Sequence, residues 1–239
     1  MINVRDKIEE IVLSIKSTGN VDSWLDNTGS YTITTASTGN LAVGFKVVLI
    51  YADTSLNRDE IITSVTDTTF TFSGSGITEP VSWRMAIYFE EGHRIELNQK
   101  YGNKLKSTPR RVSEYPLFWL YTDFQEELGD GETTAFETEL GFSIVNISDI
   151  DLMEDERMEQ KFKPVLYPYK ELIESAFNTA PYKRNFVTPW GEENTIKFKK
   201  TDRPFFGSAD KEKSVLPQIT DAIEFQVNLR WFVESTSCA

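Results

Sequence analysis

The region between residues 115 and 177 constrains the fold more than any other part of the sequence. It begins with a nearly continuous apolar run, Tyr115–Tyr121, which is typical of a strand covered on both faces. A second apolar strand is expected at 142–147. Apolar residues then recur at steps of three and four, which predicts a helix with one stripe packed on a sheet. The stripe consists of Met158, Phe162, Val165, Leu166, Tyr169, Leu172, Ile173, Ala176 and Phe177.

Two prolines interrupt this helical pattern, at Pro164 and Pro168. A proline inside a helix removes a backbone donor, and its ring clashes with the carbonyl one turn earlier. We therefore expect a break near 163–168, with one short helix over 154–162 and a second over 168–177.

An acidic run, Asp149–Glu156, precedes the first of these helices. It lacks the glycine and the alternating ligands of a calcium-binding loop. Negative charges complement the helix macrodipole at an N-terminus, and Ser148, Asp149 or Asp151 can cap the first turn. Helix capping is therefore the expected role of this run.

The two ends of the chain also show regular patterns. Residues 2–16 predict an amphipathic helix, which Gly19 and Asn20 are expected to stop. Residues 222–233 alternate between apolar and polar side chains, which predicts a strand with one buried face. The apolar positions of that strand are Ile223, Phe225, Val227, Leu229, Trp231 and Val233.

Residues 21–83 differ in composition, because they are rich in Thr, Ser, Gly and Asn. Short β-branched runs at 31–34, 44–51, 60–65 and 69–72 predict a small β module, either a barrel or a sandwich. The expected fold is therefore α+β. A core domain formed by 1–20 and 84–239 has a mixed or antiparallel sheet with packed helices, and the all-β module at 21–83 is inserted into it.

Charge and cysteine content exclude several classes of protein. A formal net charge of -12 argues against general affinity for nucleic acids or for anionic membranes. The single cysteine, Cys238, provides no disulfide framework, which fits folding in a reducing cytoplasm. No secretory signal and no transmembrane run is expected.

The sequence offers no set of residues for catalysis. His93 is the only histidine, so a metal site would lack a second nitrogen ligand. There is no Gly-x-Ser-x-Gly elbow, no phosphate loop and no dinucleotide signature. We expect a protein that is not an enzyme and that has no cofactor and no metal.

Charged and aromatic loops are the candidate contact sites. A basic loop stands out in this acidic chain, and it is either a solvated loop or a contact to an acidic neighbouring subunit or to passing DNA. Its residues are Lys100, Lys104, Lys106, Arg110 and Arg111. The matching acidic patch is expected at Glu126, Glu127 and Asp130, in a turn-rich segment. Trp190 lies in a loop where exposed aromatic residues often mark contact surfaces.

The order of patterns resembles that of a group of tailed-bacteriophage neck proteins, the tail terminator or tail completion proteins and the related head–tail joining proteins. The residues that carry the resemblance read YPLFWL, GFSIVNIS, RMEQKFKPVLYPYKELIESAF and DAIEFQVNLRWFV. It covers residues 1–17 and 84–233, and the β module is an addition to it.

The resemblance implies a structural virion protein that forms a homo-oligomeric ring, usually sixfold. Such a ring is assembled in the cytoplasm of the host bacterium. It caps the tail tube, joins it to the head connector or adaptor proteins, and lets DNA pass through its lumen without sequence-specific binding. No membrane is involved.

Two other functions remain open at this stage. The β module could recognise a carbohydrate or a protein partner in a tail or baseplate protein, with Trp24, Trp83 and Trp190 as aromatic contacts. A hydrolase is the third possibility, and it would require a metal-dependent activity that is lost in His93→Ala.

Overall fold

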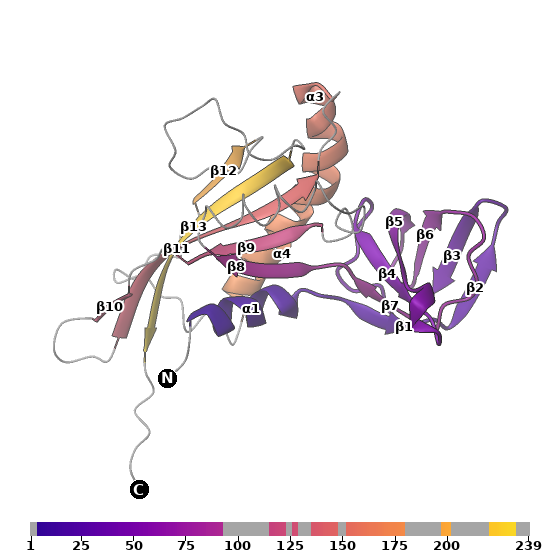
Figure 1. The fold of residues 1–239 in the computed structure, drawn as a ribbon, viewed down its shortest axis with the longest axis horizontal. Helices are drawn as coiled ribbons and strands as arrows, with labels where there is room; N and C mark the ends of the chain where they lie inside the picture. The colour runs from indigo at the N-terminus through magenta and orange to yellow at the C-terminus, as the bar shows by residue number, and fades with distance from the viewer. Residues whose placement is uncertain are drawn as a thin grey trace, which may run out of the picture.

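The computed structural model describes residues 4–92, 115–122, 126–128, 135–147, 152–179, 197–201 and 220–232. For residues 4, 126–128, 135–139, 147, 197–201, 220 and 226–232 it describes the backbone alone. The fold is α+β, as predicted, with a seven-stranded antiparallel sheet, a second mixed sheet and packed helices (Figure 1).

The seven-stranded sheet is formed near the N-terminus and curves like half of a barrel (Figure 1). Its strand order is β1-β7-β4-β5-β6-β3-β2, so that β1 and β2 are the edges. The four strands predicted in this region are present. The strands are β1 (Thr18–Asn20), β2 (Ser23–Asp26), β3 (Ser30–Thr34), β4 (Lys46–Ile50), β5 (Arg58–Val65), β6 (Thr69–Ser73) and β7 (Ser82–Met85), with the short helix η1 (Thr54–Leu56) between β4 and β5.

Alternation along these strands places aromatic and aliphatic residues on the inner face of the sheet. Ile33, Phe70 and Phe72 have no exposed surface, whereas the threonines between them are half-buried. On β7, Trp83 lies in the same core and donates from Nε1 to the Thr35 hydroxyl at 3.2 Å. The inner face is therefore a hydrophobic core, and the outer face is a polar surface.

The N-terminal helix α1 (Val4–Ser14) packs through Ile8, Ile11 and Val12 into the main hydrophobic core, to which both sheets contribute, as its pattern predicts. It ends at Ser14, five residues before Gly19, so the expectation that Gly19 and Asn20 stop the helix was wrong. Gly19 lies in β1 instead, where a Cβ atom would come within 2.9 Å of the Trp83 indole. Close packing of two strands explains this glycine.

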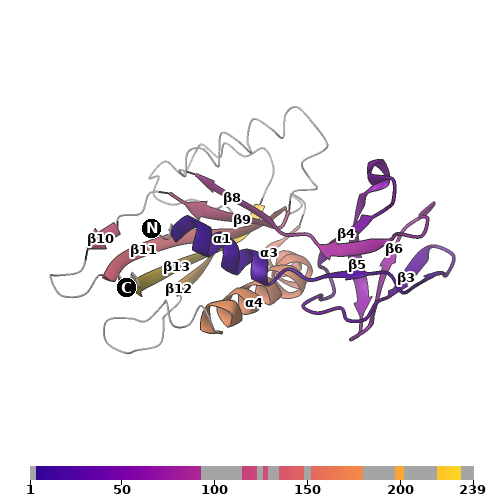
Figure 2. The ribbon, with the colours of Figure 1, turned by 90° about the horizontal axis from the view of Figure 1, so that it is seen from below.

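The second sheet has six strands, with the order β12-β13-β11-β9-β8 and with β10 paired to β11. The edge strand β8 runs parallel to β9, and the other pairs are antiparallel. Figure 2 shows α1 and α4 (Tyr167–Asn178) together along this sheet. The strands are β8 (Tyr88–Gly92), β9 (Leu117–Tyr121), β10 (Glu126–Leu128), β11 (Ala135–Ile147), β12 (Lys197–Thr201) and β13 (Thr220–Phe232).

Strand β9 is buried at all five positions, which confirms the prediction of a strand covered on both faces. Phe118 and Leu120 join the main core, and Leu117, Trp119 and Tyr121 belong to a smaller cluster on the opposite face.

The prediction of a single buried face for the last strand was wrong at residues 221–225. Glu224 is 5% exposed and Ala222 is fully buried, although both lie on the face that was expected to be polar. The reason is that Ala222 belongs to the small cluster behind β9. Phe225, on the other face, stacks on Phe142 with ring centroids 4.6 Å apart.

The helix after β11 is continuous, and the break expected near 163–168 does not occur. Helix α3 (Glu154–Arg157) leads into η3 (Met158–Leu166), a π-helix, and then into α4. The Tyr167 N–H donates to the Phe162 carbonyl, five residues back. This wider register allows the helix to continue through Pro164, because the carbonyl of residue i−4 is no longer held in the position where the proline ring clashes with it. The predicted apolar stripe is confirmed, and Pro168 lies in the first turn of α4.

Helix α4 joins the two sheets into one core. Tyr169 is fully buried. Its ring stacks on that of Phe45 in the β module, with centroids 4.1 Å apart, and meets the ring of Phe118 in β9 edge-on, with centroids 5.9 Å apart. Its hydroxyl donates to the Ala86 carbonyl at 3.1 Å, between β7 and β8. Gly44 adds a close approach, because a Cβ atom there would lie 3.2 Å from the Pro164 carbonyl oxygen.

Candidate interaction surface

Most of the contact residues predicted from the sequence lie outside the described residues. These are Lys100, Lys104, Lys106, Arg110, Arg111, Asp130 and Trp190, together with His93 and the possible capping residues Ser148, Asp149 and Asp151.

Glu126 and Glu127 lie in strand β10, and not in a loop as the turn-rich sequence suggested. Their register partners on β11 are Thr138 and Glu137. The strand was missed because three residues are too few to show a period of two.

Of the tryptophans considered as sugar contacts, Trp83 is 1% exposed and is part of the core. Trp24, on the edge strand β2, is half-buried and stacks on Tyr31 with ring centroids 4.7 Å apart. The described tryptophans of the β module therefore support its own packing, which weakens the carbohydrate-binding alternative.

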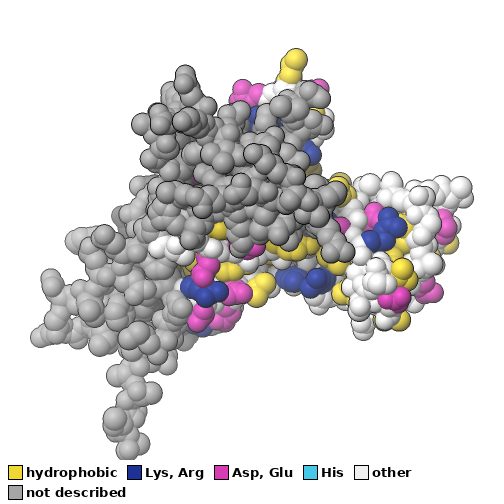
Figure 3. All heavy atoms as spheres, in the orientation of Figure 1, with side chains coloured by type: hydrophobic (Ala, Val, Ile, Leu, Met, Phe, Trp, Pro, Cys, Tyr) yellow, Lys and Arg dark blue, Asp and Glu magenta, His cyan; other side chains and the backbone are white. Residues whose placement is uncertain are grey.

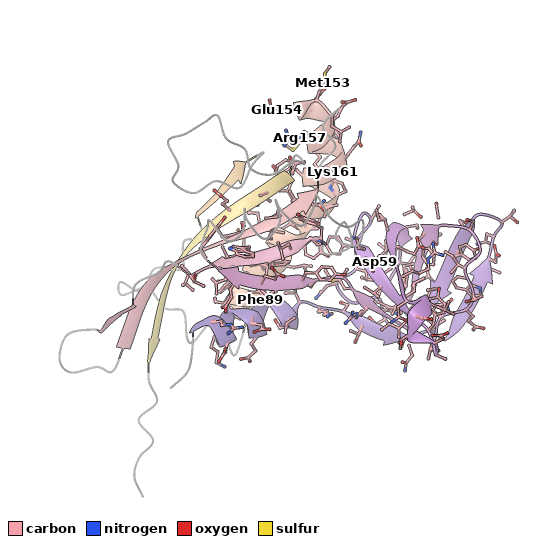
Figure 4. All side chains as sticks on the ribbon, viewed as in Figure 1. Asp59, Phe89, Met153, Glu154, Arg157 and Lys161 are labelled. Atoms are coloured by element: carbon pink, nitrogen blue, oxygen red, sulfur yellow. The ribbon has the colours of Figure 1, made fainter. Side chains whose placement is uncertain are left out.

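The first turn of α3 is acidic, as expected, but its cap differs from the prediction. The Met153 N–H donates to Glu156 Oε2 at 2.9 Å, so that Glu156 caps the helix from within its own first turn. The side chains of Glu154, Asp155 and Glu156 are exposed, and Met153 is 72% exposed. We call Met153–Glu156 the acidic turn (Figure 4).

Three cationic side chains come together on the outer face of the seven-stranded sheet, near its junction with the second sheet. In strand register, Arg84 and Asp59 flank Val48 on either side. Two residues before Val48 on the same face of β4, Lys46 is the register partner of Ile61. The Lys46 carbonyl accepts a hydrogen bond from the Ala86 N–H.

Lys16 follows α1 and completes this group, since Thr18 of β1 is the register partner of Arg84. We call Lys16, Lys46, Arg84 and Asp59 the cationic surface. Figure 3 shows dark blue side chains in this part of the molecule, on the face in view.

The charges of this surface are poorly balanced. Lys46 Nζ lies 3.8 Å from Asp59 Oδ2, which is beyond ordinary hydrogen-bond length. Burial lowers the pKa of Lys46. Burial and the repulsion of Arg84 together lower the pKa of Lys16. Burial also raises the pKa of Asp59, although Lys46 and Arg84 oppose that change. Among the described residues, Lys16 and Arg84 add two positive charges to the Lys46–Asp59 pair, in a chain whose formal net charge is -12.

The sequence did not predict the cationic surface, because its residues lie far apart along the chain. Lys16, Lys46 and Arg84 come from three strands or strand ends that meet only through the pairing β1-β7-β4. Alternation does place Lys46, Val48 and Ile50 on one face of β4, but nothing local in the sequence fixes the register of its neighbours.

A second charged group lies on the inner side of the same sheet. Arg58 contacts Glu60 at 2.6 Å, and Glu60 is buried. The Tyr51 hydroxyl is buried nearby and has no hydrogen-bond partner among the described residues. Burial raises the pKa of Glu60 above 4.5, and Arg58 offsets part of this effect.

The variant Glu60→Gln is therefore expected to be more stable than the native chain at pH 7, because it removes the cost of holding this buried carboxyl ionised. The folded state binds the Glu60 proton more tightly than the unfolded state, so this carboxyl favours folding at low pH. That contribution is lost as pH rises through the range above 4.5. Urea unfolding at several pH values should show the difference between variant and native chain growing from pH 4 to pH 7. A constant difference would contradict this account.

Among the described residues, no group of three or more His, Cys, Asp or Glu side chains could hold a metal ion. In the same part of the chain, no helix is long and apolar enough to cross a membrane. The arrangement offers charge and shape for association. No protein-family model matches the chain, and no curated protein matches its sequence.

Proposed function

We propose that this chain is a structural virion protein that forms a sixfold ring at the neck of a tailed bacteriophage. In this proposal its α+β core has a tail-terminator-like fold. The ring caps the tail tube, meets the head connector proteins, and lets DNA pass without sequence-specific binding. It assembles in the cytoplasm of the host bacterium. The sequence resemblance motivates the proposal, and a feature of the second sheet supports it.

That feature is a β ribbon that extends beyond the body of the sheet (Figure 1). Strands β11 and β13 pair over thirteen positions, from Ala135↔Phe232 to Ile147↔Thr220. Strand β9 accompanies them only at 142–145, and β10 pairs with 136–138. Among the described residues, the ribbon is therefore three strands wide at its far end, and three strands need an apolar face packed on something to be stable.

Apolar residues occupy one set of register positions along this ribbon. The positions Phe136, Leu140, Val227, Leu229 and Trp231 fall on the same face as the buried Phe142 and Phe225. In this proposal a neighbouring subunit packs on the ribbon, and a head-to-tail arrangement repeated around an axis then closes a ring.

Charge also favours contact between unlike surfaces. Glu126 and Glu127 lie in the ribbon, and the basic loop 100–111 of an adjacent copy would complement them. Copies with a net charge of -12 repel one another, so opposite charges at each contact must offset that repulsion.

Negative-stain electron microscopy of the purified full-length chain is expected to show rings. Reversal of Arg110 and Arg111 to Glu is expected to leave a folded monomer, measured by light scattering and circular dichroism. Lys7→Glu, which makes a charge change of the same kind on α1, should leave the ring intact. A ring that is unchanged by the double reversal would reject the role of the basic loop, and a native chain that stays monomeric at high concentration would reject the proposed function.

A further inference from the structure

We propose that the cationic surface of one copy receives the acidic turn of a second copy of the same chain. This inference rests on the proposed function, because it names one contact of the proposed ring. It concerns a different pair of surfaces from the basic loop and the ribbon.

The charges of the two surfaces complement each other. Within the described part of the chain, the cationic surface presents Lys16 and Arg84 beside the Lys46–Asp59 pair. The acidic turn presents three exposed carboxylates, and only Glu156 has a local role, as the cap of Met153. Glu154 and Asp155 are therefore free of the capping role and can meet a cation on another molecule.

The two surfaces also match in their apolar parts. Ile61, the register partner of Lys46, is 60% exposed. The acidic turn carries Met153, whose flexible side chain is 72% exposed. A methionine can fill an irregular apolar gap of this kind, with the charged groups around it.

One copy cannot join its own two surfaces. Figure 4 shows Met153 and Glu154 at the free end of the helix, well away from Asp59 on the β module. Each copy therefore has one surface of each kind, and the contact is heterologous. Repeated contacts of this type produce a ring if the rotation closes.

A nucleic-acid backbone is the other anion that could occupy such a surface. Asp59 lies within the group, and Ile61 is exposed beside Lys46. A carboxylate repels phosphates and an exposed apolar side chain gains nothing from them, so a protein partner fits the surface better.

The test uses two double variants of the full-length chain. The surface variant carries Lys16→Glu with Arg84→Glu, because Arg84 is exposed and Lys16 half-buried, so that neither change places a charge in the core. The turn variant carries Glu154→Lys with Asp155→Lys, and keeps Glu156 as the cap. Circular dichroism and thermal unfolding establish that each variant folds, and Arg84→Gln replaces the surface variant if it does not.

Sedimentation at low and at moderate salt is expected to show that each double variant alone associates about tenfold more weakly than the native chain. An equal mixture of the two variants should associate again, because the acidic surface of one then meets the basic turn of the other. Lys7→Glu is a single charge reversal on α1, away from both surfaces, and it serves as the control that should leave association unchanged.

Native oligomers that persist in both double variants would overturn this contact and leave the proposed ring standing. Two variants that each fail to associate, and fail again when mixed, would also overturn it. Loss of binding to a DNA duplex in the surface variant, with association unchanged, would assign the surface to phosphate instead. A native chain that never associates would remove the proposed function itself.

Discussion

Replacing Arg157 by alanine is expected to destabilise the protein by about 3–5 kcal/mol. Arg157 Nε donates to Asp221 Oδ1 at 2.9 Å, and its Nη2 contacts the same oxygen. Asp221 is fully buried, and its second oxygen has no hydrogen-bond partner among the described residues. Without Arg157 a carboxylate would remain buried and unpaired, which is among the most costly changes in a folded protein.

Equilibrium unfolding in urea measures this loss. Lys163→Ala is a suitable control, since it removes an exposed ion pair with Glu159 on the same helical segment. Its expected cost is less than about 0.5 kcal/mol. The double variant Arg157→Met with Asp221→Leu should recover most of the lost stability, because both charges are then gone. If Arg157→Ala costs no more than the control, the pair does not hold the helix to β13.

Replacing Tyr169 by alanine is expected to cost about 3–5 kcal/mol, the range for a fully buried aromatic residue. The ring lies between Phe45 of the β module and Phe118 of the second sheet, and the hydroxyl binds the Ala86 carbonyl between them. The change would leave a cavity at the point where the two sheets share one core.

Tyr169→Phe separates the two contributions of this residue. It keeps the ring and removes one buried hydrogen bond, which should cost about 1 kcal/mol. Urea unfolding followed by tryptophan fluorescence is informative here, because Trp83 belongs to the first sheet and Trp119 to the second. Equal stability of Tyr169→Ala and the native chain would contradict the role of α4 as the link between the sheets.

Much of the architecture could be predicted from the sequence, because local periodicity reports which side of an element is buried. The stripe from Met158 to Phe177, the apolar run at Leu117–Tyr121 and four strands of the β module (β3, β4, β5 and β6) were visible in this way. Periodicity gives no information on hydrogen-bond register, and so Pro164 was taken as a helix break where a π-helix accommodates it.

Strand pairing, which no local pattern specifies, decided the remaining features. The alternation along β13 assigns Glu224 to the face that was expected to be exposed to solvent. Glu224 is nevertheless buried, because the small cluster behind β9 covers that face. The cationic surface has the same origin, since Lys16, Lys46 and Arg84 become neighbours only when β1, β7 and β4 pair. The sequence by itself determined most of the helices and strands and which of their faces are apolar and pack in a core. The tertiary structure alone decided which charges meet, because strand register brings together residues that are far apart along the chain.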